Sequence, residues 1–588
     1  MTDRSLHDSL DLSSESPPPD FLVQHRMVLL ALLGVVLYVG CIGLFDLWYP
    51  DEPDIAEVAQ AMFVSGDWIA PRRMGAIWVD YPPLTYWAGS LSSAVLGGMN
   101  PFTLRLPSAL AAIGLVLLTC AMGSRWYDGK TGLWAGFLLL TFSQFVLEAV
   151  GYRTDMLFSF FIGAGLFVYA SGVGDRMRWW PRVAGFALLG LAMLTKGPLG
   201  LLLPGLVLTL WHGARREWRA LLQLAPLSLI SLAIFIPWFV ACAKEMGSDN
   251  MLYELWAQNF QRFVSGERTH RRPLYYYLVA IWYDLAPWTL LFPFALWWIH
   301  QNRLWQDRHT QLAIWWFAAF FVFLSIAVTK RQMYLLPAYP AIALLIAPWI
   351  RTVTKIGADL GSPDSRLARV SVAFYAMVLI LVGVVCLTSA VSTGPVMARL
   401  DLEALYKNVV LAMRLPSVVL GAISLAAGLW VARAWRRGDI PRAFYRSAVA
   451  FFSIYLIGCA WIMPTINPVK TYAPAGRWIR EHISSEKYMG LAFPGRDISK
   501  MGAFGFETGA LVQLLEKEDE IDRFFREHPK SVVLLHKESA SKIYGNDRTD
   551  WRALVIHELV AGGYHYFVLR AAHDLTTRRI TSLQDENR

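Results

Sequence analysis

Long apolar runs separated by short polar connections dominate the first 465 residues of this 588-residue chain. Most runs hold roughly 18 to 25 residues, which is enough for a helix to cross about 30 Å of hydrocarbon. We therefore expect a mostly α-helical polytopic membrane protein with about thirteen transmembrane helices. The expected spans are 27–48, 104–123, 132–149, 155–172, 182–198, 200–213, 221–243, 275–299, 311–328, 333–350, 370–393, 411–434 and 443–463.

One connection, from about residue 48 to 101, is far longer than the others. Residues 54–64 carry apolar side chains at helical spacing, and residues 84–96 form a second, shorter apolar stretch. We expect both as helices that lie at the membrane surface, with a true span as the alternative for the second.

The pattern changes again at about residue 466. Strand-length apolar runs at 488–493, 531–536 and 564–569 alternate with amphipathic helical stretches at 474–483, 510–527 and 551–561. This alternation predicts an α/β domain over 466–588 with a partly parallel sheet. At the other end, residues 1–25 are mostly polar and contain three consecutive prolines, which predicts a disordered cytoplasmic tail.

Composition supports a membrane protein and argues against a nucleic-acid partner. Hydrophobic residues make up 55% of the chain and charged residues 17%, whereas a large soluble protein needs more polar residues to cover its surface. The formal charge of +9 comes largely from short loops between spans, where the topology of membrane insertion accounts for basic residues.

The positive-inside rule predicts a cytoplasmic N-terminus. An odd number of spans then puts the 48–101 loop and the 466–588 domain outside the cytoplasm, as expected for a multi-pass protein of a bacterial-type inner membrane. The basic residues assigned inside are Arg125, Lys130, Arg176, Arg178, Arg182, Arg215, Arg216, Arg219, Arg303, Arg308, Arg351, Lys355, Arg366, Arg369, Arg436, Arg437, Arg442 and Arg446.

Carboxylates cluster after the first apolar run, among them Asp51, Glu52, Asp54 and Asp80. Carboxylates at a bilayer edge are costly to dehydrate, so a cluster there points to chemistry. A carboxylate held there can act as a base that takes the proton of a hydroxyl, or it can orient a nucleophile that has no proton to lose or stabilise positive charge on a substrate. The alternative is structural: Asp51 caps the next helix and Glu52 lies in its first turn.

A set of basic residues lies on the external side that the positive-inside rule disfavours. These residues either snorkel to lipid phosphates or bind a lipid-linked phosphate, which Arg can grip with two parallel hydrogen bonds. They are Arg72, Arg73, Arg153, Lys196, Lys244, Arg262, Arg268, Arg271, Arg272, Lys330 and Arg331.

Three stretches of the external loop resemble the first external loop of C-type (GT-C) glycosyltransferases, above all the 4-amino-4-deoxy-L-arabinose lipid A transferases and the related protein mannosyltransferases. They are Asp51-Glu52-Pro53-Asp54-Ile55-Ala56-Glu57-Val58-Ala59, Gly66-Asp67-Trp68-Ile69-Ala70-Pro71 and Tyr81-Pro82-Pro83-Leu84-Thr85-Tyr86-Trp87. Further landmarks are Asp155, the Thr195-Lys196-Gly197-Pro198 turn and the segment from Lys330 to Ala341.

The resemblance covers about residues 25–465 and implies that residues 26–465 form a transmembrane GT-C catalytic domain, with 466–588 as an accessory domain. It implies an inverting transfer from a polyprenyl-phosphate sugar on the outer face of the membrane. The acceptor would be a lipid A-like glycolipid, another glycan or a protein.

The resemblance also implies residue roles. Asp51 would be the principal catalytic carboxylate with Glu52 beside it, and Asp155 would be the second, or else simply the acid in the first turn of its helix. Tyr334 would face the donor phosphate, or else anchor the chain at the membrane interface.

The chain departs from the arabinosyl branch at Asp54, usually Arg, and at Tyr81, usually Lys. We expect other cations to replace the lost phosphate-binding charge: Arg72, Arg73, Lys196, Arg268, Arg271 or Lys330. In the resembled family, positions equivalent to Asp80 and His270 form a metal pair. One carboxylate and one imidazole are an incomplete zinc shell, so a divalent, zinc-like ion here would be structural.

Other classes of function stay open. A transporter or flippase for an anionic lipid-linked sugar would suit many spans, although transporters usually place ionisable residues at mid-membrane, where these runs hold few. A non-catalytic scaffold has only the 466–588 domain to support it.

Overall fold

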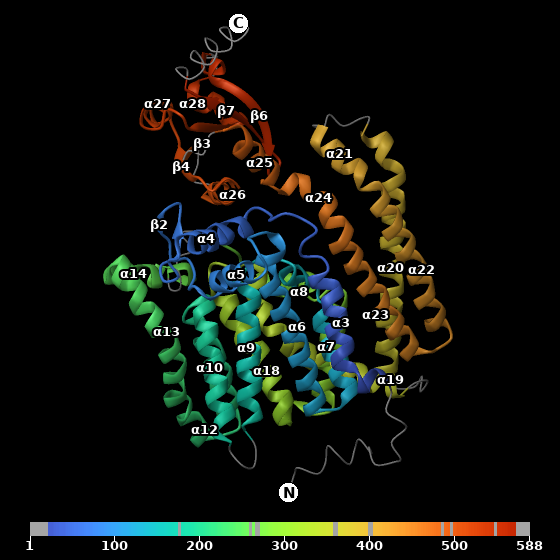
Figure 1. Cartoon of the computed structure of the whole chain (residues 1–588). Coiled ribbons are helices and arrows are strands. Elements are labelled where there is room, and N and C mark those ends of the chain that lie inside the picture. Colours follow the sequence, from blue (N-terminus) through green and yellow to red (C-terminus); the bar gives the residue numbers. More distant parts are fainter. Residues whose placement is uncertain are drawn as a thin grey trace, which may run out of the picture.

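The computed structural model describes residues 21–173, 178–257, 261–264, 271–356, 363–397, 404–483, 487–493, 498–545 and 550–571. It has a helical bundle with an α/β domain stacked on one end (Figure 1). Most of the predicted N-terminal tail lies outside the described residues, and its last part forms the short helix α2 (Phe21–Gln24).

The expectation of a multi-pass membrane protein is confirmed, but the count of thirteen spans is not. Within the described residues, eight helices are long and apolar enough to cross a membrane, and a ninth is reached if the bent pair α7 (Gly129–Leu140) and α8 (Ser143–Ala149) counts as one span. The eight are α6 (Pro101–Trp126), α9 (Thr154–Ser171), Trp218–Met246, α18 (Arg308–Ile326), Gln332–Lys355, Pro363–Thr393 within α20 (Pro363–Met397), Leu405–Arg436 and Ile440–Lys470.

The shortfall has three causes: some apolar runs contain a break in the helix, one helix is short, and one has charged residues near its ends. The first run yields α3 (Arg26–Gly34) and a π-helical turn that ends at Val39, and α11 (Leu199–Ala214) has 16 residues. The 275–299 run divides into α16 (Tyr276–Asp284) and α17 (Leu291–Gln301) around Pro287, which has no backbone N–H to continue a helix. The remaining run, α10 (Trp179–Lys196), has charged residues near both ends and is not among the eight.

Two helices lie across one end of the bundle, as predicted for the long loop. They are α4 (Asp51–Ser65), which ends at the left-handed Gly66 (φ 73°), and the 12-residue α5 (Leu84–Val95), which is too short to span. Between them a small hairpin pairs β1 (Arg72–Arg73) with β2 (Ala76–Ile77).

The α/β domain has a five-stranded sheet in the order β4-β3-β5-β7-β6. β4 (Leu511–Leu515), β3 (Tyr488–Ala492) and β5 (Val532–His536) are parallel, whereas β7 (Tyr564–Arg570) and β6 (Val555–Ala561) run antiparallel. The helices are α25 (Ala473–His482), α26 (Ile498–Thr508), α27 (Glu518–Glu527) and α28 (Ala540–Tyr544).

The partly parallel sheet is confirmed, but two predicted helices are wrong. The stretch predicted at 510–527 begins as β4 and becomes helical only at Glu518, and most of the stretch predicted at 551–561 is β6. β6 and β7 join through Gly562 and Gly563, both with positive φ (57° and 79°), which is the two-residue connection typical of a β-hairpin.

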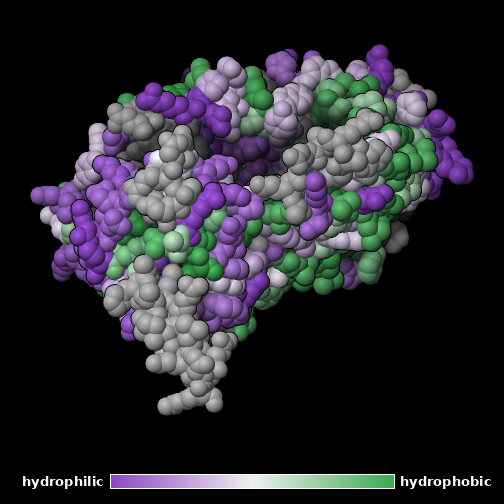
Figure 2. All heavy atoms as spheres, turned by 90° about the horizontal axis from the view of Figure 1, so that it is seen from above, coloured by the Kyte–Doolittle hydropathy of each residue, from purple (hydrophilic) through white to green (hydrophobic). Residues whose placement is uncertain are grey.

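Ion pairs between side chains show which loops between the helices lie at the same end of the bundle. At one end, the Asp51 face, Asp51 meets Arg153 and Arg331. At the other end, the opposite face, Arg351 pairs with Asp128 at 2.9 Å and Arg308 with Glu217 at 3.0 Å. Figure 2 views the molecule from above the α/β domain: hydrophilic residues gather on the left and hydrophobic residues on the right, where α20 and α22 (Arg414–Arg436) stand in Figure 1.

Candidate active site

Asp51 begins α4 and is held by two arginines from distant parts of the chain. Nη2 of Arg331 donates to Oδ2 at 2.6 Å and to Oδ1 at 2.8 Å, and Nη2 of Arg153 lies 3.0 Å from Oδ2. The N-cap of the helix is Pro50 and no side chain caps it, so Asp51 is an acid of the first turn. Burial alone would lower the pKa of Arg331, but the Asp51 carboxylate raises it above its ordinary value.

Asp155 lies two residues beyond Arg153, in the first turn of α9, and forms an ion pair with Lys196 at the end of α10. Both side chains are about nine-tenths buried. The Lys196 Nζ lies 4.6 Å from the ring centre of Tyr334 and 5.9 Å from that of Tyr81. The structure therefore brings Asp51, Asp155, Lys196 and Tyr334, all predicted from the sequence, to one place.

Glu52 is buried, and both oxygens of its carboxylate accept hydrogen bonds from groups outside this cluster. Its Oε1 accepts from Nε of Arg105 (2.7 Å) and from the backbone N–H of Tyr152 (2.8 Å), and its Oε2 accepts from Nη2 of Arg105 and the backbone N–H of Trp48, both at 2.7 Å. Arg105 is fully buried and also donates to backbone carbonyls that follow α3. These contacts favour a structural role for Glu52 over the predicted catalytic one.

The predicted basic residues behave differently from one another. Lys330 donates from its ammonium group to the backbone carbonyl oxygens of Arg272 (3.2 Å) and Ala327, so it links two backbone segments. Its neighbour Arg331 binds Asp51 instead. Arg72 pairs with Asp67 at 3.1 Å and with Glu245 at 3.2 Å. Arg271 pairs through its backbone with Thr329. Arg268 lies outside the described residues.

Only one residue of the predicted metal pair, Asp80, is among the described residues, so the pair stays a prediction. Asp80 is half-buried in the loop before α5, whereas His270 lies outside the described residues. Among the residues that the structure describes, no group of three His, Cys, Asp or Glu side chains is arranged to hold a metal ion. Asp80 alone does not make a metal site.

Asp54, where the resembled branch usually has Arg, faces the α/β domain instead. Its Oδ1 accepts from Nη2 of Arg73 at 2.6 Å, and a side chain at Gly502 of α26 would overlap the same oxygen. Burial raises the pKa of Asp54 from 3.8 to about 7, and the nearby Arg73 only partly offsets this rise. The departure at this position thus belongs to a contact between α4 and α26.

One participant was not singled out from the sequence and another was missed. Arg331 was only one of several misplaced basic residues, and nothing in the sequence distinguished it from Lys330. Glu148 of α8 accepts from Nη1 of Arg153 at 2.9 Å, but it stands inside an apolar run where a single acid is easily read as incidental.

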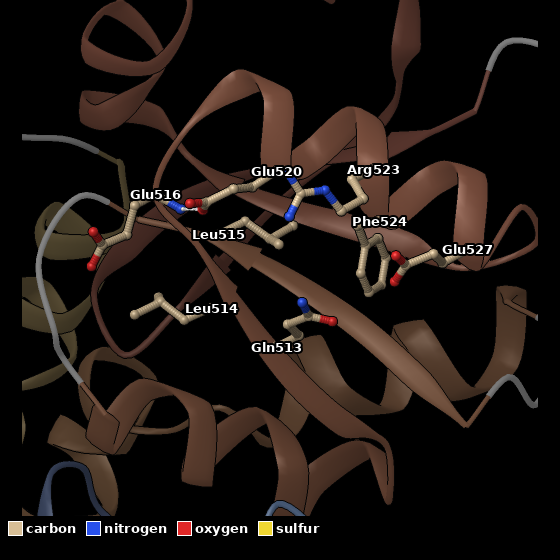
Figure 3. Close-up of a pocket in the computed structure, with 8 residues that line it drawn as sticks. All are labelled: Gln513, Leu514, Leu515, Glu516, Glu520, Arg523, Phe524 and Glu527. Atoms are coloured by element: carbon tan, nitrogen blue, oxygen red, sulfur yellow. Dashed lines mark hydrogen bonds between the residues drawn. The ribbon is translucent and has the colours of Figure 1, made fainter.

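A surface groove of about 350 Å³ lies elsewhere, in the α/β domain between β4 and α27. Figure 3 shows Glu520, Arg523 and Glu527 on α27 beside Gln513 of β4, with no side chain from the helical bundle among them. The groove is therefore separate from the Asp51 cluster.

Comparison with known proteins fits the resemblance seen in the motifs. The family model described as dolichyl-phosphate-mannose-protein mannosyltransferase matches residues 80–241. An undecaprenyl phosphate-alpha-4-amino-4-deoxy-L-arabinose arabinosyl transferase of Edwardsiella ictaluri is 31% identical over 336 residues, which are 55% of this chain and 59% of that protein. The enzyme of the same name from Pseudomonas paraeruginosa is 32% identical over 54% of this chain and 58% of its own. The alignments thus span less than two thirds of these relatives.

Solved structures show the same fold. ArnT from Cupriavidus metallidurans, bound to undecaprenyl phosphate, superposes with a TM-score of 0.71 at 20% identity, covering 93% of this chain and 98% of that one. The archaeal oligosaccharyltransferase AglB from Archaeoglobus fulgidus, in complex with an inhibitory peptide and a dolichol-phosphate, gives 0.51 at 12% identity over 90% of this chain and 71% of its own. The chain is therefore similar to these transferases in sequence and has an ArnT-like fold.

Proposed function

We propose that this protein is an integral membrane glycosyltransferase that moves a sugar from a polyprenyl-phosphate donor to an acceptor. One observation carries the proposal: four separated segments bring the carboxylates Asp51 and Asp155 together with Arg153, Arg331 and Lys196 at one end of a membrane-spanning bundle. Such a cluster can receive a phosphate that is anchored in the bilayer by its lipid tail.

The charges divide the work of the reaction. In an inverting transfer the acceptor oxygen bonds to the anomeric carbon as the bond from that carbon to the phosphate oxygen breaks, and the phosphate leaves with the electron pair. Arg331 and Lys196 would stabilise the charge that develops on the leaving phosphate. Asp51 would take the proton of a hydroxyl acceptor, or orient a phosphate acceptor that has no proton to lose.

The orientation in the membrane follows from the basic loops of the opposite face. If that face is in the cytoplasm, the Asp51 face and the α/β domain lie on the other side of a bacterial-type inner membrane, outside the cytoplasm. The short or broken apolar helices α3, α10, α11 and α16–α17, with the bent α7–α8 pair, would complete the thirteen spans expected from the sequence.

The acceptor that we propose first is a lipid A-like glycolipid, because the relatives of about 30% identity are named as arabinosyl transferases. Another glycan or a protein are the alternatives, since the matching family model is named for a protein mannosyltransferase. Asp80 and His270 remain a predicted pair for a structural divalent ion, with no role in the transfer steps above.

The test is transfer from synthetic undecaprenyl-phosphate sugars by the purified protein in liposomes, with lipid A as acceptor. The wild type should transfer sugar, and Asp51→Asn should lose at least about a hundredfold in kcat, the effect typical of removing a general base. Full activity in Asp51→Asn would refute the proposed site. Movement of the lipid across the bilayer without any transfer would favour the flippase alternative.

A further inference from the structure

Glu148 is a buried carboxylate of the site with no role in the chemistry described above. It lies near the end of α8 and its residue is 1% exposed. Its Oε1 accepts from Nε2 of Gln144 and from Nη1 of Arg153, both at 2.9 Å. Its Oε2 is buried and has no hydrogen-bond partner among the described residues.

The path of the chain explains how this acid reaches the site. The axes of α7 and α8 differ by 68°, so α8 turns away from the direction of α7, and residues 150–153 connect it to α9. Arg153 is the N-cap residue of α9 and lies between two carboxylates, with Nη1 on Glu148 and Nη2 on Asp51. Glu148 therefore fixes one side of the guanidinium whose other side holds Asp51.

Glu148 also balances the charges of the site. Three carboxylates, Asp51, Glu148 and Asp155, are joined by ion pairs to three cations, Arg153, Arg331 and Lys196. Without Glu148 the group would carry one uncompensated positive charge in a partly buried environment, where charge interactions are stronger than in water.

In the proposed reaction, the net charge of the site affects how tightly the product binds relative to the donor. A polyprenyl-phosphate sugar is a phosphodiester with one negative charge, whereas the polyprenyl phosphate that leaves is a monoester whose second pKa is near 6. The product is therefore more negative than the donor at neutral pH, and an excess cation would hold the product more tightly than the donor.

We propose that Glu148 is a positioning residue that fixes Arg153 against Asp51 and whose negative charge allows the polyprenyl phosphate product to leave. This inference rests on the proposed function. It differs from a purely structural role because it predicts that loss of the charge strengthens the binding of an anionic lipid.

The decisive variant is Glu148→Gln, which keeps an oxygen to accept from Arg153 but has no charge. We expect it to bind undecaprenyl phosphate about tenfold more tightly than the wild type and to show a kcat about tenfold lower, with the KM for the donor unchanged or reduced. Glu148→Asp keeps the charge on a shorter side chain, so it should lower kcat while leaving the affinity for undecaprenyl phosphate at the wild-type value.

The matched control is Asp128→Asn. Asp128 is also a carboxylate paired with an arginine at a helix end, but it lies on the opposite face, 2.9 Å from Arg351. This control should leave both product affinity and kcat unchanged. Binding of undecaprenyl phosphate is measured by titration of the purified proteins without turnover, and its inhibition of transfer is measured separately.

The outcomes separate the two proposals. A wild-type protein that transfers no sugar from any polyprenyl-phosphate donor would overturn the proposed function, whatever the variants do. An active wild type whose Glu148→Gln variant binds undecaprenyl phosphate no more tightly would overturn only the role of Glu148. If Glu148→Gln fails to fold, Glu148→Asp decides: a changed product affinity in this charge-retaining variant would also overturn it.

Discussion

At the scale of single residues, adjacent positions do different work. Lys330 and Arg331 are neighbours, yet the first binds backbone carbonyls and the second holds Asp51. We expect Arg331→Gln to lower kcat/KM by about a hundredfold or more, because it removes a cation aimed at the carboxylate and at the leaving phosphate. Lys330→Gln should change the KM for the donor little and should lower the Tm instead. Transfer assays and thermal unfolding of both variants check this, and the reverse pattern would restore Lys330 as the phosphate ligand.

Asp51 and Glu52 are a second such pair. Glu52 and Arg105 form a buried ion pair in which both partners are almost inaccessible to water. Removing one partner of such a pair typically costs about 3–5 kcal/mol, because it leaves the other charge buried without a counter-ion. We expect Glu52→Ala to lose several degrees or more of Tm, whereas Asp51→Asn should keep its Tm and lose activity. Calorimetry of both proteins checks this, and a stable but inactive Glu52→Ala variant would support the catalytic role.

The sequence allowed part of the site to be predicted, and the limits are physical. Asp51, Asp155 and Lys196 stand at the ends of apolar runs, so their polarity is visible against the pattern. The direction of a side chain is not visible, which is why Glu52 and Lys330 were assigned roles that their contacts do not favour. Glu148 lies inside an apolar run, and its contact with Arg153, which also holds Asp51, depends on how the chain packs after the bend between α7 and α8.

At the scale of elements, hydrophobicity predicted helices better than it predicted their breaks. The bend in the 132–149 run depends on packing, whereas the break in the 275–299 run has a signal in the sequence, Pro287, which an average of hydropathy does not register. In the α/β domain the error had a visible signal: Gly562-Gly563 between two alternating stretches is a hairpin turn, and it outweighs the helical spacing expected for 551–561.

This hairpin makes a testable contrast between two glycines. Gly562 and Gly509 both have positive φ (57° and 72°), but a Cβ at Gly562 would overlap the ring of Tyr472, whereas nothing lies within 4 Å at Gly509. We expect Gly509→Ala to show backbone strain alone, about 1–3 kcal/mol, and Gly562→Ala to be more destabilising because the ring must also move. Urea unfolding of both variants, monitored by protease resistance of the α/β domain, measures the difference. Equal losses would mean that the Tyr472 contact is unimportant.

At the scale of the whole molecule, the α/β domain packs against α4, the helix that carries Asp51. The side chain of Met74, in the turn of the β1–β2 hairpin, accepts through its Sδ from the backbone N–H of Val512 at 3.3 Å. The absence of a side chain at Gly502 lets α26 approach Asp54 of α4. The domain is therefore positioned to fix α4, although it holds no part of the cluster around Asp51.

We expect Gly502→Leu to separate α26 from α4 and to lower kcat severalfold, while the helical bundle stays folded. The control is Gly509→Ala, just beyond the end of α26, where nothing lies within 4 Å of an added Cβ, so it should show backbone strain without moving α26 from α4. Transfer assays together with detergent-resistant folding of the bundle check the expectation. Wild-type activity in Gly502→Leu would show that the domain does not position Asp51.

The same contact should make stability depend on pH. Asp54 faces Arg73, Ser499, Asp51 and Glu57, and burial raises its pKa from 3.8 to about 7 in spite of Arg73. Burial likewise raises the pKa of Glu57 from 4.5 to about 7. Between about pH 4 and pH 7 the folded protein therefore binds more protons at these groups than the unfolded chain does, so they stabilise it in acid and this stability is lost as the pH rises through 7.

Asp54→Asn isolates one of these groups because asparagine stays neutral at every pH. We expect the variant to have a higher Tm than the wild type at pH 8, where the wild type must keep a charged carboxylate buried against α26. The gap should narrow as the pH falls below 7, where Asp54 becomes protonated in the folded protein, and close near pH 4, where the unfolded chain is protonated at this group as well. Thermal unfolding of both proteins across this range at constant ionic strength measures the gap. A lower Tm for Asp54→Asn at pH 8 would mean that the ion pair with Arg73 outweighs the cost of burial, and the α4–α26 contact would then be stabilised by alkaline rather than acidic conditions.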